Sequence, residues 1–485
     1  MQESLKEKTA RGLLWGAVNN GGQQVLSLAF GIVLARLLTP QDYGMVGMLA
    51  IFSLIATALQ ESGFRAALAN LKTARHEDYN AVFWCSLTVG VAAYAVLYAC
   101  APLIADFYGV EELAPLARYS FLSVPIASLG SAQGAWLYRN LQVKQQAAAG
   151  IVALVLSGGI GVSMAYCGFS YWGIATQSLA YLAVSTSCSW RFSPWRPTLC
   201  FDLRPAARLF AFSSRLLVTN IANHLNNNLL TVILGRAFDA QAVGNYSQAN
   251  KWNAMGHQLI TGMVGSVALP VLAKVRGDRV RELRVFRKML RLTAFTSFPA
   301  MFGLAVVAEE LIVLAVGEKW LGSALMMSIL CLGGAFSPVN TLFSNLVVSQ
   351  GRSDIYMRRI VLQLAVQLCG VLLIALLHGS VYMMILMYVS VNVCWLLVWW
   401  RDSRRFIGLG LADLLRDLLP FLLAAAAACG LAWLSAWLFG GCMVVRLAVK
   451  MAVAAVCYLG LMKLFGAEIL TECLEFVRRR RHDAK

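Results

Sequence analysis

Three apolar stretches of the chain, residues 12–35, 206–235 and 242–271, carry polar side chains at helical spacing. Amides donate and accept hydrogen bonds and cations bind anions, so these side chains suit a ligand rich in hydroxyl and acidic groups. In chain order they are Asn20, Gln23 and Gln24, then Arg215, Asn223 and Asn227, and then Gln248, Lys251 and His257. The alternatives are hydrogen bonds between helices and, for the asparagines at 226–228, a helix break or the outer mouth of a pathway.

Lys251 is the candidate whose position is hardest to explain by structure alone. A lysine near the middle of a membrane span costs about 2.5–3.5 kcal/mol on insertion scales, so it needs a pairing acid, water or a ligand anion. Residues 206–235 and 242–271 contain no Asp or Glu. The sequence therefore predicts that Lys251 contacts a ligand anion, with an ion pair to another span as the alternative.

Further candidates lie outside these stretches. Arg65 follows Glu61 by four residues on one helical face, so it either pairs with Glu61 or contacts ligand. Asn345 lies on a mildly polar face of residues 322–349. Arg36 and Arg236 lie at the outer ends of two spans, where they either contact ligand or cap the preceding helix.

No catalytic residue, cofactor or metal site is predicted. The chain has 12 cysteines, most of them in apolar runs and without CxxC spacing. They have the positions of small core residues, so neither a metal site nor a disulfide framework is expected.

The composition shows which elements must position these residues. Of the 485 residues, 59% are hydrophobic and 13% are charged, whereas soluble domains average roughly 45–50% and about 25%. A membrane span needs about 20 apolar residues, and such runs recur along the chain. The sequence predicts an all-α polytopic membrane protein with about fourteen transmembrane helices, of which residues 114–138 and 322–349 each form one.

Charge predicts the orientation of these spans. Most of the 41 Lys and Arg residues fall in loops on one face, which the positive-inside rule makes cytoplasmic. An even number of spans then places both termini in the cytoplasm. The net charge of +17 is spread over short loops, so it indicates topology rather than nucleic-acid binding. The basic stretch 274–291 is expected to lie on the anionic inner leaflet, as a topology determinant or, alternatively, to recruit an anionic substrate or a partner.

An internal repeat predicts the lobes. Residues 34–44 and 234–244 share Leu, Arg, Gln and Gly at a shift of 200, and both join the first two spans of a six-span block. Parallel repeats usually form two lobes with a substrate pathway between them. The predicted organisation is an N-lobe of six spans (1–190), a cytoplasmic linker (191–205), a second six-span lobe (206–400), two further spans (401–466) and a basic cytoplasmic tail (467–485).

Several segments together resemble one family. They are residues 34–44, 61–68, 78–80, 234–251 and 269–272. In these segments and in its fourteen-span, two-lobe layout, the chain resembles the polysaccharide-transport (Wzx-type) flippases of the multidrug/oligosaccharidyl-lipid/polysaccharide exporter superfamily. The resemblance covers about residues 10 to 400.

The resemblance implies transport rather than an enzymatic reaction. It implies that the protein moves polyprenyl-diphosphate-linked oligosaccharide units across the cytoplasmic (inner) membrane of a bacterium by alternating access. The units would serve O-antigen, capsule or exopolysaccharide biosynthesis, and spans 13 and 14 would help to hold the lipid tail. The implied partners are this lipid-linked oligosaccharide, membrane lipids and other polysaccharide-assembly proteins, with the transporter itself a monomer.

Two other functions compete with this one. A cation-coupled multidrug antiporter of the same superfamily would share the fold, but such proteins usually rely on buried carboxylates. Residues 12–35, 206–235 and 242–271 contain none. A membrane enzyme such as a glycan ligase would need catalytic groups in a sizeable outer loop, and the predicted outer loops are short.

Overall fold

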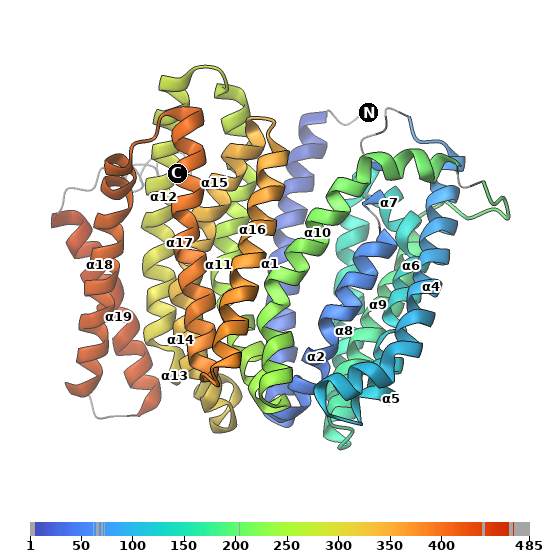
Figure 1. Ribbon diagram of the computed structural model, residues 1–485, viewed down its shortest axis with the longest axis horizontal. Helices are drawn as coiled ribbons and strands as arrows, with labels where there is room; N and C mark the ends of the chain where they lie inside the picture. The colour runs from blue at the N-terminus through green and yellow to red at the C-terminus, as the bar shows by residue number, and fades with distance from the viewer. Residues whose placement is uncertain are drawn as a thin grey trace. The chain divides into compact units, whose positions relative to one another are not determined.

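Every regular element in the described part of the chain is a helix in the computed structural model (Figure 1). The structure describes residues 5–61, 63–64, 67–68, 71, 73–202, 204–438, 442–464 and 469; the side chains of 5–20, 206–209 and 211–216 are outside this description. The side chains of 437–438 are outside it as well. Within the described part, ten helical segments are long and apolar enough to cross a membrane.

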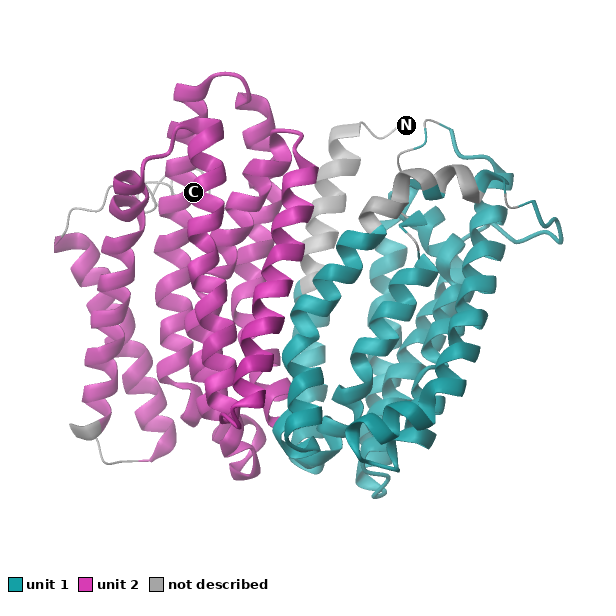
Figure 2. Ribbon diagram, in the orientation of Figure 1, with its two compact units in different colours: residues 1–244 teal, residues 245–485 magenta. Residues whose placement is uncertain are grey.

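The chain divides into two compact units, Met1–Gly244 (unit 1) and Asn245–Lys485 (unit 2), coloured separately in Figure 2. Unit 1 contains α1 (Leu5–Leu37), α2 (Pro40–Glu61), α4 (His76–Tyr108), α5 (Leu113–Ser120), α6 (Ser123–Leu129), α7 (Ser131–Arg139), α8 (Val143–Tyr166), α9 (Tyr171–Phe192), α10 (Arg204–Ala237) and the first turn of α11 (Ala240–Val275). Helix α10 belongs to unit 1 because it packs against α2 and α4.

Unit 2 begins within α11 and contains the remaining helices. These are α12 (Arg279–Val306), α13 (Ala308–Val316), the short 3₁₀ helix η1 (Glu318–Trp320), α14 (Leu321–Gly334), α15 (Ser337–Ser349), α16 (Ser353–Leu376), α17 (Val381–Ile407), α18 (Leu411–Leu438) and α19 (Met443–Leu464). The boundary at residue 244 lies beyond the 191–205 linker of the predicted organisation.

The two repeated joints have the same local structure. Helix α1 ends at Leu37 and α2 begins at Pro40, while α10 ends at Ala237 and α11 begins at Ala240, so the shift of 200 holds for both boundaries. At the first joint, the amide of Thr39 donates to the Asp42 carboxylate at 2.8 Å, and the Asp42 amide donates back to the Thr39 hydroxyl at 3.3 Å. This reciprocal cap satisfies two otherwise orphaned N–H groups.

The second joint uses a simpler cap at the equivalent position. The Asp239 carboxylate accepts a hydrogen bond of 2.7 Å from the amide of Ala242, which satisfies one of the first N–H groups of α11. The equivalence of the two joints, predicted from the sequence, is confirmed at the level of helix boundaries and cap positions.

The two joints also cross each other, at a pair of glycines. A Cβ atom on Gly44 would lie 1.7 Å from the carbonyl oxygen of Ala240, and a Cβ on Gly244 would lie 1.7 Å from that of Pro40. Only the absence of a side chain allows backbones to approach so closely. The contact is reciprocal: Gly44 meets Ala240 and Gly244 meets Pro40, and Pro40 and Ala240 occupy equivalent positions in the repeat.

Two predicted spans are broken helices, which corrects the expectation of one continuous helix in each. Residues 114–138 fall into α5, α6 and α7, and residues 322–349 into α14 and α15. Proline explains the break between α5 and α6 and the break between α14 and α15, because it lacks an N–H to donate to the fourth preceding carbonyl. Pro125 cannot donate to Phe121, where α5 gives way to α6, and Pro338 cannot donate to Gly334, the last residue of α14.

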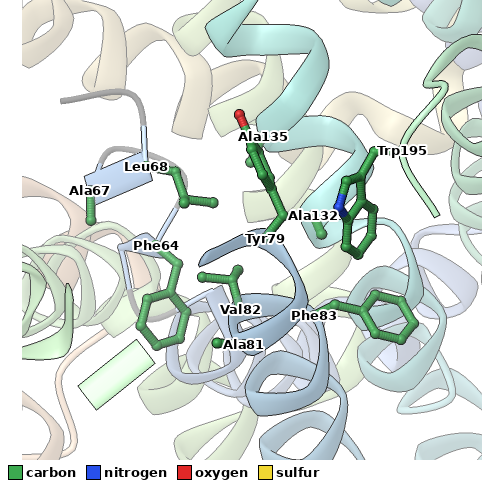
Figure 3. Packing of buried hydrophobic residues seen from close by; sticks show 10 residues of the cluster. All are labelled: Phe64, Ala67, Leu68, Tyr79, Ala81, Val82, Phe83, Ala132, Ala135 and Trp195. Carbon is green, nitrogen blue, oxygen red and sulfur yellow. The ribbon is translucent and has the colours of Figure 1, made fainter. Parts of the chain in front are cut away.

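The segment after α9 is docked onto α4 rather than extended away from it. The Asn80 side chain accepts a 2.9 Å hydrogen bond from the amide of Thr198 and donates one of 2.6 Å to the carbonyl of Cys200. The buried ring of Trp195 lies 6.0 Å from those of Tyr79 and Phe83 (Figure 3). We call the buried residues drawn in Figure 3 the aromatic cluster; they are Phe64, Ala67, Leu68, Tyr79, Ala81, Val82, Phe83, Ala132, Ala135 and Trp195.

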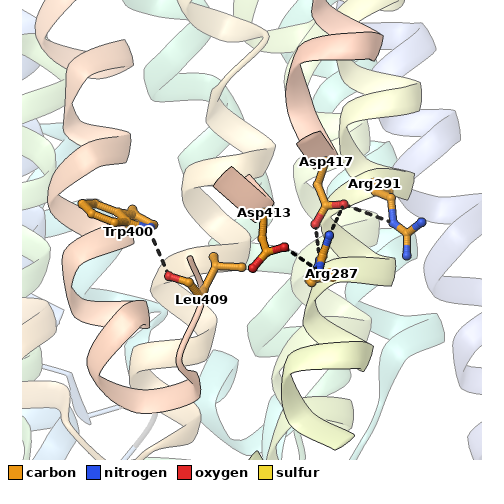
Figure 4. Close-up of polar contacts among 6 residues, drawn as sticks. All are labelled: Arg287, Arg291, Trp400, Leu409, Asp413 and Asp417. Carbon is orange, nitrogen blue, oxygen red and sulfur yellow. Dashed lines mark hydrogen bonds and ion pairs between the residues drawn. The ribbon is translucent and has the colours of Figure 1, made fainter. Parts of the chain in front are cut away.

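In unit 2, ion pairs fasten α12 to the start of α18 (Figure 4). The Arg287 guanidinium lies 2.9 Å from the Asp413 carboxylate and 2.6 Å from that of Asp417. The neighbouring Phe286 side chain is fully buried. From Arg279 onward, residues 274–291 form the first turns of α12, where Phe286 and Leu290 are fully buried and Val280 is 69% exposed. The expectation that this stretch lies on the inner leaflet stays a prediction.

Candidate functional site

Unit 1 contains a polar cavity of about 510 Å³. Residues from α1, α2, α4, α8 and α9, and from the broken span of α6 and α7, line it. Its polar lining consists of the amides Gln23, Gln60 and Gln146, the hydroxyls Ser86, Ser131, Tyr181, Ser185, Thr186 and Ser189, and the carboxylate Glu61. Among the described lining residues no side chain is cationic, so the cavity offers neutral hydrogen-bonding groups beside a single acid.

Glycines bring the helices around this cavity close together. A Cβ on Gly150 of α8 would lie 2.2 Å from the Gln23 amide nitrogen of α1, and one on Gly158 would lie 2.6 Å from the Phe30 ring. Helix α1 thus packs its side chains directly onto the backbone of α8, which fixes where Gln23 meets the cavity. A Cβ on Gly90 would lie 1.9 Å from the Ser128 hydroxyl in the same way.

Two lining side chains are buried without a partner. Gln60 is 1% exposed and Ser86 is 0% exposed, and neither the amide atoms of Gln60 nor the hydroxyl of Ser86 has a hydrogen-bond partner among the described residues. Leaving a buried polar group unsatisfied costs about 1–3 kcal/mol. These groups have unused capacity to hydrogen-bond a polar occupant of the cavity.

The aromatic cluster forms part of the cavity wall. Phe64 and Val82 belong to the cluster and also line the cavity. Leu68, another member of the cluster, is held to α7, because the Arg139 guanidinium donates to its backbone carbonyl. Part of the wall of the polar cavity is thus apolar.

Unit 2 contains a second cavity, of about 580 Å³, with the opposite chemistry. It lies between α12, α13, α18 and α19, and its lining is almost entirely apolar. Representative lining residues are Phe295, Leu304, Ala428, Met451 and Leu459. A cavity of this kind suits a hydrocarbon chain rather than a polar ligand.

A buried ion pair lies at this apolar cavity. The Lys450 ammonium lies 2.6 Å from the Glu310 carboxylate and donates a 3.1 Å hydrogen bond to the Val306 carbonyl. Lys450 is 6% exposed and Glu310 is 2% exposed. The pair fastens α19 to α13, and neither residue was among the site residues predicted from sequence.

The predicted site residues of unit 1 are placed as follows. Gln23 lines the polar cavity and Gln24 is half-buried in the next position of α1. In α10, Asn223 is half-buried and Asn227 is exposed. The side chains of Asn20, Arg65 and Arg215 lie outside the described residues.

At the joints, Arg36 and Arg236 are both exposed. The Arg236 guanidinium lies over the ring of Phe107, 5.8 Å from its centroid. This is a cation–π contact with α4, which the sequence analysis did not foresee.

The predicted site residues of unit 2 are polar groups with unused hydrogen-bonding capacity. Gln248 is buried, and its amide oxygen has no hydrogen-bond partner among the described residues. His257 and Asn345 are half-buried, and Nδ1 of His257 and the amide nitrogen of Asn345 also lack a partner there. Lys251 is half-buried, and no acidic side chain in the described part of the chain forms an ion pair with it. Its role as a phosphate contact stays a prediction.

Sequence reasoning missed most of the polar cavity. Gln60 and Gln146 lie beside other polar residues at the ends of predicted spans, Ser86 lies within an apolar run, and none belongs to a helical stripe like the one that singled out Gln23. They lie on three different helices, so only the tertiary structure brings them together. No group of three or more His, Cys, Asp or Glu within the described residues is placed to hold a metal ion.

Comparison with solved structures gives the fold. A structure of the lipid II flippase MurJ in an inward closed conformation covers 94% of this chain and 100% of its own, with a TM-score of 0.77 and 14% identity. An inward-facing multidrug resistance MATE family transporter of the MOP superfamily covers 80% of this chain and 94% of its own, with a TM-score of 0.64 and 17% identity. At these identities the similarity shows a shared all-helical fold.

Comparison of sequences identifies curated relatives over most of the chain. The chain is 27% identical over 471 residues to the teichuronic acid biosynthesis protein TuaB of Bacillus subtilis (strain 168), covering 95% of this chain and 96% of TuaB. It is 27% identical over 361 residues to the lipopolysaccharide biosynthesis protein WzxC of Escherichia coli (strain K12), covering 73% and 72%. The succinoglycan biosynthesis transport protein ExoT of Rhizobium meliloti (strain 1021) is 25% identical, covering 70% and 69%.

A family model matches residues 33–325, which is more than half of the 485-residue chain. The match begins just before the first repeated joint, extends through the second and ends in α14. The chain therefore belongs to the family described as polysaccharide biosynthesis protein.

Proposed function

We propose that this protein is a flippase that moves lipid-linked oligosaccharide repeat units across the cytoplasmic membrane for polysaccharide biosynthesis. The observation that carries the proposal is membership of a family whose relatives are named as polysaccharide biosynthesis and transport proteins. The structural similarity to a lipid II flippase supports it, since lipid II flipping is the same class of task.

The two cavities match the two ends of such a substrate. A lipid-linked oligosaccharide has a hydroxyl-rich head and a long hydrocarbon tail, and the chain has one polar and one apolar cavity. In the proposed mechanism the apolar cavity beside α18 and α19 holds part of the tail while the head crosses. Lys251 contacts the diphosphate, because it is a half-buried cation without an acidic partner among the described residues.

The proposed architecture has fourteen spans, in two six-helix lobes and two C-terminal helices, with both termini in the cytoplasm. One cap hydrogen bond is shared by the two joints, from the amide of Asp42 to the Thr39 side chain and from the amide of Ala242 to the Asp239 side chain, and it supports the repeat on which this layout depends. The lobes would alternate between inward-open and outward-open states, without any covalent step. The protein is then a monomeric transporter that acts beside other polysaccharide-assembly proteins.

A cell that depends on this protein for its surface polysaccharide provides the test. Deleting the gene should abolish the polymer and trap the lipid-linked precursor on the cytoplasmic face, and expressing the wild-type chain should reverse both effects. Lys251→Ala should fail to reverse them and Lys251→Arg should succeed, at equal protein levels. Unchanged polysaccharide after the deletion would refute the proposed function.

A multidrug antiporter is the second candidate, favoured by the fold shared with a MATE transporter and by Glu61 at the polar cavity. It predicts that the protein protects cells against cationic drugs and that Glu61→Gln abolishes this protection. A drug-susceptibility assay on the deletion strain separates the two candidates. The flippase predicts no change in drug susceptibility when the polysaccharide is not itself needed as a barrier.

A further inference from the structure

The polar cavity of unit 1 has features of a ligand site that the family membership does not assign. It is lined by helices of one unit, has a volume of about 510 Å³, and contains buried amide and hydroxyl groups without partners among the described residues. This volume lies within the range of about 300–1,000 Å³ that is typical of small-molecule sites.

The chemistry of the lining selects among the parts of a lipid-linked oligosaccharide. A diphosphate needs cationic or N–H-rich surroundings, whereas the only charged side chain among the described lining residues is the carboxylate Glu61. A hydrocarbon tail would leave Gln60 and Ser86 unsatisfied. A sugar is the remaining part, and its hydroxyls donate and accept hydrogen bonds as amides and serine hydroxyls do.

The cavity also offers apolar surface of the kind that a sugar ring contacts. Phe64, Val82, Leu137 and Leu182 line it beside the polar groups, so a ring could place its C–H face on apolar atoms and its hydroxyls on the amides. The bare backbone of Gly134 lines it as well, and no atom lies within 4 Å of the position that a Cβ would take there, which leaves room close to the helix axis.

We propose that the polar cavity of unit 1 is a binding subsite for an uncharged sugar unit of the transported oligosaccharide, with Gln60 and Ser86 as direct hydrogen-bonding residues. This proposal rests on the proposed function and deepens it, because it states which part of the substrate enters unit 1. The diphosphate then lies outside this cavity.

The chain offers a matched control for the key residue. Gln133 resembles Gln60 in burial, since their side chains are 0% and 1% exposed, and the amide atoms of both lack partners among the described residues. Unlike Gln60, Gln133 does not line the cavity. Gln60→Met and Gln133→Met therefore remove equally buried amides, and only the first removes one from the proposed subsite. Ser86→Ala provides a second, smaller change at the subsite.

The experiment measures binding to the full chain in lipid nanodiscs by isothermal titration calorimetry. The probes are the oligosaccharide released by mild acid from the cell's lipid-linked precursor, and geranyl diphosphate as a sugar-free diphosphate. We expect Gln60→Met to weaken oligosaccharide binding about tenfold, corresponding to the loss of one or two hydrogen bonds, and Ser86→Ala to weaken it in the same direction. Gln133→Met should bind it like the wild type, and all variants should bind geranyl diphosphate equally.

Three results would overturn the subsite. The wild-type chain could fail to bind the oligosaccharide, Gln60→Met and Ser86→Ala could bind it as tightly as the wild type, or these variants could lose as much affinity for geranyl diphosphate as for the oligosaccharide. Complementation separates this failure from failure of the proposed function. If the wild-type chain restores polysaccharide in the deletion strain while the subsite variants bind normally, only the subsite is wrong. If the wild-type chain does not restore it, the flippase function itself is wrong.

Discussion

The reciprocal glycine crossing predicts that adding a single methyl group at Gly44 or Gly244 disrupts the protein. A Cβ at either position would lie 1.7 Å from a backbone carbonyl oxygen, whereas ordinary contacts of a Cβ are 3.4–4 Å. The obstructing atom is backbone and cannot rotate away, so the start of α11 must move away from α2. Overpacking of this kind costs about 1–3 kcal/mol where the structure can relax, and more where it cannot.

The assay compares Gly44→Ala and Gly244→Ala with Gly262→Ala, a helical glycine of α11 that has open space around its Cβ position. We expect the first two variants to lose thermal stability in detergent and to lose polysaccharide complementation, and Gly262→Ala to retain both. Because both crossing substitutions strain the same contact, the double variant should be less destabilised than the sum of the two. Wild-type behaviour of Gly44→Ala and Gly244→Ala would refute the close crossing.

Three further predictions concern the remaining contacts. Lys450→Met should destabilise the chain by about 3–5 kcal/mol because it leaves the Glu310 carboxylate buried and unpaired. The double variant Lys450→Met/Glu310→Leu should recover most of this stability. If the single and double variants unfold at the same denaturant concentration, the stabilising role of the ion pair is contradicted. Ala455→Trp, at an exposed position on the wall of the apolar cavity, should weaken binding of a long-chain polyprenyl diphosphate but not of geranyl diphosphate; an equal effect on both ligands would argue against a tail site. Arg287→Met should release the start of α18, measured as faster proteolysis near residue 410, and unchanged cleavage would contradict this anchoring role.

The sequence predicted those features that are encoded locally. Apolar runs, basic loops and the repeat at residues 34–44 and 234–244 are patterns in the chain itself, so the all-helical membrane class and the equivalent joints followed from them. The breaks at Pro125 and Pro338 carried a local signal too, but length and hydropathy alone favoured continuous spans.

The candidate site depended on tertiary structure and was predicted only in part. Gln23 was identified because it belongs to a polar stripe within one helix, whereas Gln60 and Ser86 lie on two other helices and belong to no such stripe. Lys450 and Glu310 are 140 residues apart, and sequence spacing gives no sign of their pairing. Contacts between distant segments carry no periodic signal, which is why the cavities emerged only from the structure.

The most direct test of the central claim is flipping of a lipid-linked oligosaccharide by the purified protein. The full chain is reconstituted into liposomes that carry the precursor in both leaflets, and a membrane-impermeant lectin reports how much sugar is exposed outside over time. The flippase account predicts that lectin first binds the outer pool and then, only in liposomes with the protein, binds the inner pool as it crosses. Retention of the inner pool at the level of protein-free liposomes, under both an imposed membrane potential and an ion gradient, would contradict the account.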